Sequence, residues 1–158
     1  MRRSAGERKL ADFLRSGAQN PSPMPPVNDL RQLLQNLCPE RNPGTYVFTL
    51  VPDTAGIDRT LPVATIREPE GTTLILQQEV ADGLGLPYTY RAAWITLRVR
   101  SDLAAVGLTA AVATALAAEG ISCNVMAGYY HDHLFVEVER GEAALRVLRR
   151  LSEGEREG

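Results

Sequence analysis

GISCNVMAGYYHDHLFVEV, residues 120–138, is the stretch of sequence that decides the fold. Apolar side chains recur at every second position in two runs, which are separated by a cluster of glycine, tyrosine, histidine and aspartate. The recurring positions are Ile121, Cys123 and Val125 in the first run and Leu134, Val136 and Val138 in the second. Alternate side chains of a β-strand point to the same face, so each run predicts a strand with one apolar face. Together the two runs predict a β-hairpin.

The segments around this hairpin supply the partners for its apolar face. Residues 107–119 carry apolar side chains at helical spacing, and Gly120 stands where a glycine commonly ends a helix. Residues 142–151 show the same helical spacing, whereas residues 94–100 alternate as a strand does. The order strand, helix, strand, strand, helix predicts an α+β module of the ferredoxin-like type, an antiparallel sheet with helices on one face.

The first half of the chain predicts a less regular version of the same module. The expected elements are a helix at residues 30–37, a strand at 46–51, two strands at 62–66 and 72–77, and a short helix at 78–83. We therefore expect two ferredoxin-like modules. The predicted division is a tail at residues 1–26, an N-terminal module at 27–86, a C-terminal module at 87–152 and a second tail at 153–158.

Composition and charge restrict the classes of function. The chain has 158 residues and a formal net charge of −2, so it lacks the basic surface of a nucleic-acid-binding protein. The longest uncharged run, residues 103–118, is shorter than the roughly 20 apolar residues that span a membrane. The charged N-terminus lacks the apolar core of a signal peptide. Cys38 and Cys123 form no CxxC pair, so we expect reduced cysteines, a cytoplasmic location and no nucleic-acid or membrane partner.

Two blocks carry a resemblance to a known family. Val106-Gly107-Leu108 opens the predicted helix, and residues 121–136, ISCNVMAGYYHDHLFV, form the hairpin. This arrangement resembles the ACT domain, and in particular the double-ACT proteins related to aspartate-kinase regulatory regions and to cytosolic arginine sensors. Residues 43–48, PGTYVF, match the same uncharacterised branch of the family, and the resemblance covers about residues 27–152.

The resemblance implies a regulatory protein that binds a small molecule, most plausibly an amino acid, and that neither catalyses a reaction nor needs a cofactor. It also implies a homo-oligomer, because ACT domains usually pair. Ligands of the family lie between paired modules, near the loop that leads from the first strand into the first helix.

Several residues could form such a ligand site. The start of the helix offers backbone N–H groups to a carboxylate at Val106, Gly107 and Leu108. Asp132 is the candidate for the cationic end of the ligand, because its segment resembles the Asp-His segment of the arginine sensors. Asp102 is the second choice for this role. Asn124 is a further candidate for the ligand site, where it would line a contact between subunits or between modules. Each has a structural alternative: Gly107 as a packing glycine, Asp132 as a turn residue and Asn124 as an exposed polar residue.

The hairpin raises two other possibilities. His131 and His133 could bind a metal ion, but a stable site needs a third ligand, and the sequence has no other histidine. We therefore expect no metal. Cys123 with a histidine and Asp132 is the only possible nucleophilic set, and Cys123 falls on the apolar face, where a thiol is inert. Two alternatives to an amino-acid sensor remain: a structural interaction module without a ligand, and a small metal-dependent or hydrolytic enzyme that uses the hairpin.

Overall fold

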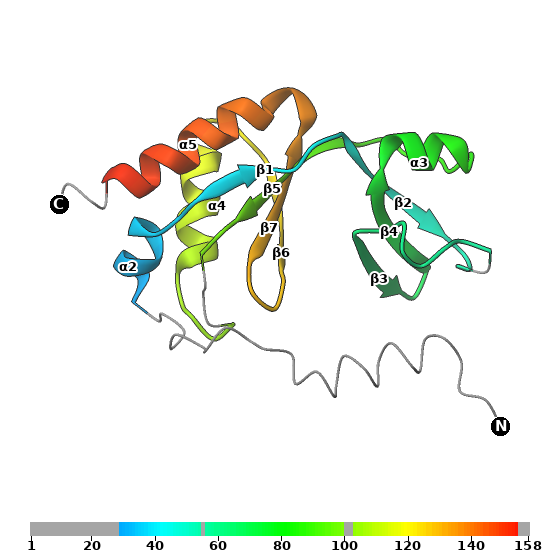
Figure 1. Ribbon diagram of the computed structural model, residues 1–158, viewed down its shortest axis with the longest axis horizontal. Helices are drawn as coiled ribbons and strands as arrows, with labels where there is room; N and C mark the ends of the chain where they lie inside the picture. Colours follow the sequence, from blue (N-terminus) through cyan, green and yellow to red (C-terminus); the bar gives the residue numbers. More distant parts are fainter. Residues whose placement is uncertain (1–28, 55, 100–102, 155–158) are drawn as a thin grey trace.

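The structure, a computed structural model, describes residues 29–54, 56–99 and 103–154. The predicted tail at residues 1–26 and the candidate Asp102 lie outside these residues. In chain order the elements are α2 (Leu30–Gln35), β1 (Pro39–Arg41), β2 (Tyr46–Val51), β3 (Ala64–Glu68), β4 (Gly71–Gln77), α3 (Gln78–Gly83), β5 (Arg91–Leu97), α4 (Leu108–Ala118), β6 (Cys123–Ala127), β7 (Asp132–Glu137), the 3-10 turn η1 (Val138–Arg140) and α5 (Gly141–Gly154) (Figure 1).

The described strands form one antiparallel sheet in the order β3-β4-β2-β5-β7-β6, and β1 pairs with β5. The predicted hairpin is confirmed as β6 and β7, with Cys123 opposite Val136 and Ala127 opposite Asp132. The strand expected at residues 94–100 begins earlier and ends earlier, because its pairing with β2 starts at Arg91. The alternation of apolar residues predicts the part of this strand that faces the core. It does not predict where the strand begins and ends, because the ends depend on pairing with other strands.

The two halves of the sheet share β5. One edge of β5 pairs with β7 at residues 92–97. Its other edge pairs first with β2, where Ala92 lies opposite Tyr46, and then with β1, where Ile95 lies opposite Arg41. The N-terminal half thus has the order β5-β2-β4-β3, and the C-terminal half has the matching order β1-β5-β7-β6. Each half completes its ferredoxin-like sheet with a strand from the other part of the chain.

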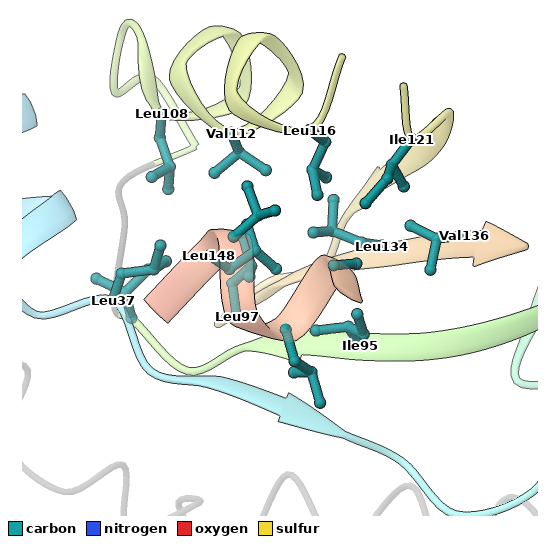
Figure 2. Close-up of a cluster of buried hydrophobic side chains, with 14 of the residues drawn as sticks. Leu37, Ile95, Leu97, Leu108, Val112, Leu116, Ile121, Leu134, Val136 and Leu148 are labelled. Carbon is teal, nitrogen blue, oxygen red and sulfur yellow. The ribbon is translucent and has the colours of Figure 1, made fainter. Parts of the chain in front are cut away.

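One face of the C-terminal half is covered by α2, α4 and α5 (Figure 1). Figure 2 shows Leu108, Val112 and Leu116 of α4 pointing toward Leu134 of β7 and Leu148 of α5. These side chains are all buried. Ile121 is buried in the same core, and Cys123 and Val125 are half-buried against it. The apolar face predicted for the first run of the hairpin is therefore the face that packs on the helices.

The corresponding face of the N-terminal half is covered more sparsely, by the short helix α3 (Figure 1). Its core is also smaller. The buried residues of this core are Val47, Val51, Leu74, Leu76 and Ala81. The connection between β2 and β3, residues 52–63, contains no helix in the part that the structure describes, although α4 fills the equivalent connection of the C-terminal half.

The opposite, helix-free face of the sheet carries aromatic residues at the junction of the two halves. The ring of Trp94 on β5 lies edge-on to Tyr46 on β2, with centroids 5.1 Å apart, and is stacked on Phe135 of β7 at 6.1 Å. Phe48 of β2 also meets Phe135 edge-on at 5.4 Å. Because these rings come from β2, β5 and β7, they tie the two halves together across the shared strand. No helix in the described part of the chain is long and apolar enough to span a bilayer.

Candidate functional site

The start of α4 is closely packed. Gly107 precedes the helix with φ of 106°, a left-handed conformation that favours glycine. A Cβ atom on Gly107 would lie 2.9 Å from Cδ2 of Leu30 in α2, so the Leu30 side chain would have to move to accommodate any other residue here. Leu108 is buried in the core, whereas Val106 is 84% exposed. These contacts favour the packing interpretation of Gly107, and its part in binding a carboxylate stays a prediction.

Asp132 lies at the same end of the C-terminal half as this helix start. It is the first residue of β7, where it is half-buried opposite Leu97, the last residue of β5. The turn before it is closed by a hydrogen bond from Gly128 N–H to the carbonyl of His131, at 2.9 Å. The His131 ring lies 3.4 Å from the carbonyl of Val99, in the segment that leads from β5 toward α4. The hairpin turn and this segment are therefore neighbours.

Asn124 lies elsewhere. It is on β6 opposite Phe135, whose ring belongs to the helix-free face, so Asn124 and the start of α4 are on opposite faces of the sheet. Its side chain hydrogen-bonds Tyr90; burial raises the pKa of that phenol, and the hydrogen bond from Asn124 lowers it. The structure thus brings Asp132 and the approach to α4 to one end of the module but does not bring Asn124 to them.

A polar cluster that the sequence did not predict surrounds His133. Trp94 Nε1 donates a hydrogen bond to His133 Nδ1 at 3.1 Å, and Thr96 Oγ1 lies 3.2 Å from the same nitrogen. Asn42 Nδ2 donates to Thr96 Oγ1 at 2.8 Å. Thr96 and His133 are direct partners across β5 and β7. Only this strand register places them together, and nothing in the sequence pattern specified it.

These contacts fix the state of His133. An indole N–H can only donate, so Nδ1 must accept and the proton of the neutral ring lies on Nε2. Desolvation by burial lowers the pKa of His133, the neighbouring His131 lowers it further, and Asp132 opposes them. A Cβ atom at Gly128 would lie 3.1 Å from Nε2, so the turn packs directly against the ring. The lone pair that a metal or a proton would need is already used by Trp94.

The surroundings of Cys123 are those of a core thiol and not of an activated nucleophile. Burial raises the pKa of the Cys123 thiol, which keeps it protonated and poorly nucleophilic. Within the described residues, no three side chains of histidine, cysteine, aspartate or glutamate gather as a metal site would require. His133 is not placed as a base for Cys123, because Cys123 packs on the helix-facing side of the sheet and His133 lies on the other.

Two ferredoxin-like modules that share one strand form a tandem architecture, and comparisons with known proteins identify its family. Residues 25–93 match one family of ACT domains and residues 89–150 match another. The chain therefore belongs to the ACT-domain family. The two matches overlap at residues 89–93, which include the start of the shared strand β5.

Solved structures agree with this fold. The chain is 49% identical to a protein of unknown function from Vibrio cholerae, named as a possible transport protein, with a TM-score of 0.71, covering 78% of this chain and 95% of that one. The regulatory subunit of aspartate kinase from Thermus thermophilus, in a ligand-free form, has 14% identity and a TM-score of 0.54, covering 72% of this chain and 95% of the subunit. This second likeness shows the fold alone. None of the curated proteins compared with the chain matches it.

Proposed function

We propose that this protein is a non-catalytic regulatory protein of the cytoplasm that binds an amino acid and assembles as a homo-oligomer. The observation that carries the proposal is the pair of ACT modules joined through β5. ACT domains commonly serve small-molecule regulation, and a strand shared by two modules is a direct mechanical link between them. A ligand that binds one arrangement of the modules better than another would shift the equilibrium between these arrangements.

The site that we propose lies at the approach to α4. Backbone N–H groups of Val106, Gly107 and Leu108 would bind the ligand carboxylate, and Asp132 would bind its cationic group. The neighbouring positions of the hairpin turn and the segment before α4 support this pairing. Asp102 remains part of the proposed site by sequence, and Asn124 is proposed as a contact between modules.

A thermal-shift screen of the purified chain against the twenty amino acids tests the proposal. A ligand present at a hundred times its dissociation constant adds about 2.7 kcal/mol to the free energy of unfolding, which raises Tm by several degrees. Asp132→Ala is expected to abolish that rise while the unliganded protein still unfolds cooperatively. The control is Asp82→Ala, which removes an exposed carboxylate that accepts a hydrogen bond from Tyr88.

Two results would count against this function. If no amino acid raises Tm, the protein is the structural interaction module without a ligand. If Asp132→Ala binds as tightly as the unchanged chain, Asp132 does not belong to the site. Sedimentation analysis at several protein concentrations tests the homo-oligomer separately, and a monomer at all concentrations would remove that part of the proposal.

A further inference from the structure

A hollow of about 470 Å³ opens on the helix side of the N-terminal half. Its floor is formed by β3 and β4, and its wall by the connection between β2 and β3, with Ile57 and Pro62 among the lining side chains. In the C-terminal half, α4 packs over the equivalent part of the sheet. The described part of the N-terminal connection forms no helix, and the strands beneath it are therefore left partly uncovered.

The hollow is lined by positive charge without matching negative charge. Arg59 reaches it from the connection and Arg67 from β3, and no acidic side chain lines it. Neither guanidinium makes a hydrogen bond or ion pair with the described part of the chain. Asp53, Glu68 and Glu70 line an adjoining depression that shares Arg67 with the hollow.

Hydroxyl groups line the floor between the arginines. Across the strands, Arg67 pairs with Thr72, and Thr65 pairs with Leu74. All four line the hollow, so the floor offers three hydrogen-bonding side chains beside the apolar Leu74. A guanidinium offers a planar fork of donors that fits a carboxylate or phosphate, and threonine hydroxyls can donate to the remaining oxygens.

Thr49 adds an independent observation. It lies on β2 directly opposite Leu74 and on the same face as Val47 and Val51. Thr49 is only 4% exposed, and its hydroxyl has no hydrogen-bond partner in the described structure. A buried hydroxyl without a partner costs about 1–3 kcal/mol, which a valine of the same shape would avoid. This face of the N-terminal sheet is therefore more polar than its packing requires.

We propose that this hollow is a second ligand site, which binds a small organic anion through Arg59 and Arg67. The anionic oxygens would be held by the two guanidinium groups and by the hydroxyls of Thr65 and Thr72, while the carbon skeleton lies against Ile57 and Leu74. The shared chemistry is a carboxylate or a phosphate on a compact molecule. The site is separate from the proposed amino-acid site at α4, because it lies in the other module, and it does not depend on that proposal.

The test is a titration of the full chain with succinate and with inorganic phosphate, at a fixed ionic strength of about 0.15 M. Calorimetry measures the affinity, and backbone amide NMR shifts locate the site. Binding is expected to shift the amides of residues 54–74 and to leave those of α4 unchanged. The neutral analogue succinamide is expected not to bind. Succinate alone binding would identify a carboxylate site, and phosphate alone binding would identify a phosphate site.

Matched variants decide whether the two arginines form the site. Arg59→Met and Arg67→Met are each expected to weaken binding by about tenfold or more, since each removes a charge-assisted hydrogen bond. Both arginines are exposed, so neither substitution should change the free energy of unfolding by much. The control is Arg146→Met, which removes an exposed arginine of α5 that has no ion pair in the described residues. It should leave the affinity unchanged.

Three results would overturn the proposal. The first is no binding of either anion up to about 10 mM, a ceiling that corresponds to negligible affinity. The second is an equal loss in Arg146→Met and Arg67→Met, because that pattern indicates general attraction of anions. The third is a shift of α4 amides in place of residues 54–74.

Discussion

At the scale of single residues, the contact between Trp94 and His133 couples an indole to a titratable ring. The indole donates to Nδ1 of the neutral imidazole. Protonation would place a hydrogen on that nitrogen, so that two N–H groups would face each other and the hydrogen bond would be lost. The lowered pKa of His133 has its main cause in burial, and this contact gives the neutral state a specific partner.

The first prediction concerns the pH dependence that follows. The pKa of His133 in the folded chain is below its ordinary value, so the unfolded chain binds the proton more readily. The stabilisation from neutral His133 is complete above about pH 6.5 and is lost as the pH falls from there toward the folded pKa. Trp94 is the only tryptophan, so its fluorescence should change with a midpoint below that value. Urea unfolding at neutral and acidic pH measures the accompanying loss of stability.

The chain supplies its own controls for this prediction, because His131 and His133 are its two histidines. His133→Gln should remove the fluorescence transition. His131→Gln should keep it and move its midpoint to higher pH, because the charge of His131 lowers the pKa of His133. A transition that survives in His133→Gln would show that another group controls the fluorescence of Trp94.

At the scale of elements, the start of α5 is fitted closely to β5. A Cβ atom on Gly141 would lie 2.8 Å from Cβ of Ala93, and both residues are buried. Gly141→Ala is therefore expected to lower the free energy of unfolding by about 1–3 kcal/mol, the usual cost of overpacking. Gly154→Ala, at the other end of the same helix, meets nothing within 4 Å and should stay within about 0.5 kcal/mol. Urea unfolding of both variants measures the difference, and equal effects would mean that α5 shifts to accommodate the methyl group.

The same elements show what sequence pattern can and cannot predict. The hairpin, α4 and α5 were predictable because their apolar residues follow the period of the element that buries them. The strand β1 was missed, since Pro39–Arg41 is three residues long and gains its structure only by pairing with the end of β5. The contacts of the candidate site also fall into those that a local sequence pattern predicts and those that it does not. Residues near each other in sequence, such as Asp132 and the hairpin turn, were placed together, whereas the contact between Asn42 and Thr96 depends on long-range pairing that no local pattern encodes.

At the scale of the whole molecule, the sharing of β5 determines how the protein can unfold. The predicted division near residue 87 separates the modules in sequence, but both use β5 in the sheet, and β1 from the start of the described chain completes the C-terminal half. The rings of Tyr46, Trp94 and Phe135 pack across the same junction. Loss of either half would leave the other with an unpaired sheet edge and exposed aromatic surface.

We therefore expect a single cooperative unfolding transition, although the family matches define two domains. Trp94 fluorescence, which reports on the junction, should change at the same urea concentration as far-ultraviolet circular dichroism, which reports on both halves.

Leu134→Ala, in the core of the C-terminal half, should lower the common midpoint by an amount that corresponds to about 2–5 kcal/mol. Val47→Ala, in the N-terminal core, should also lower this midpoint. If Val47→Ala instead separated the transition into two steps, β5 would be stable in the C-terminal half alone. A ligand effect could then not pass between the modules through this strand, and regulation would require a contact outside the sheet.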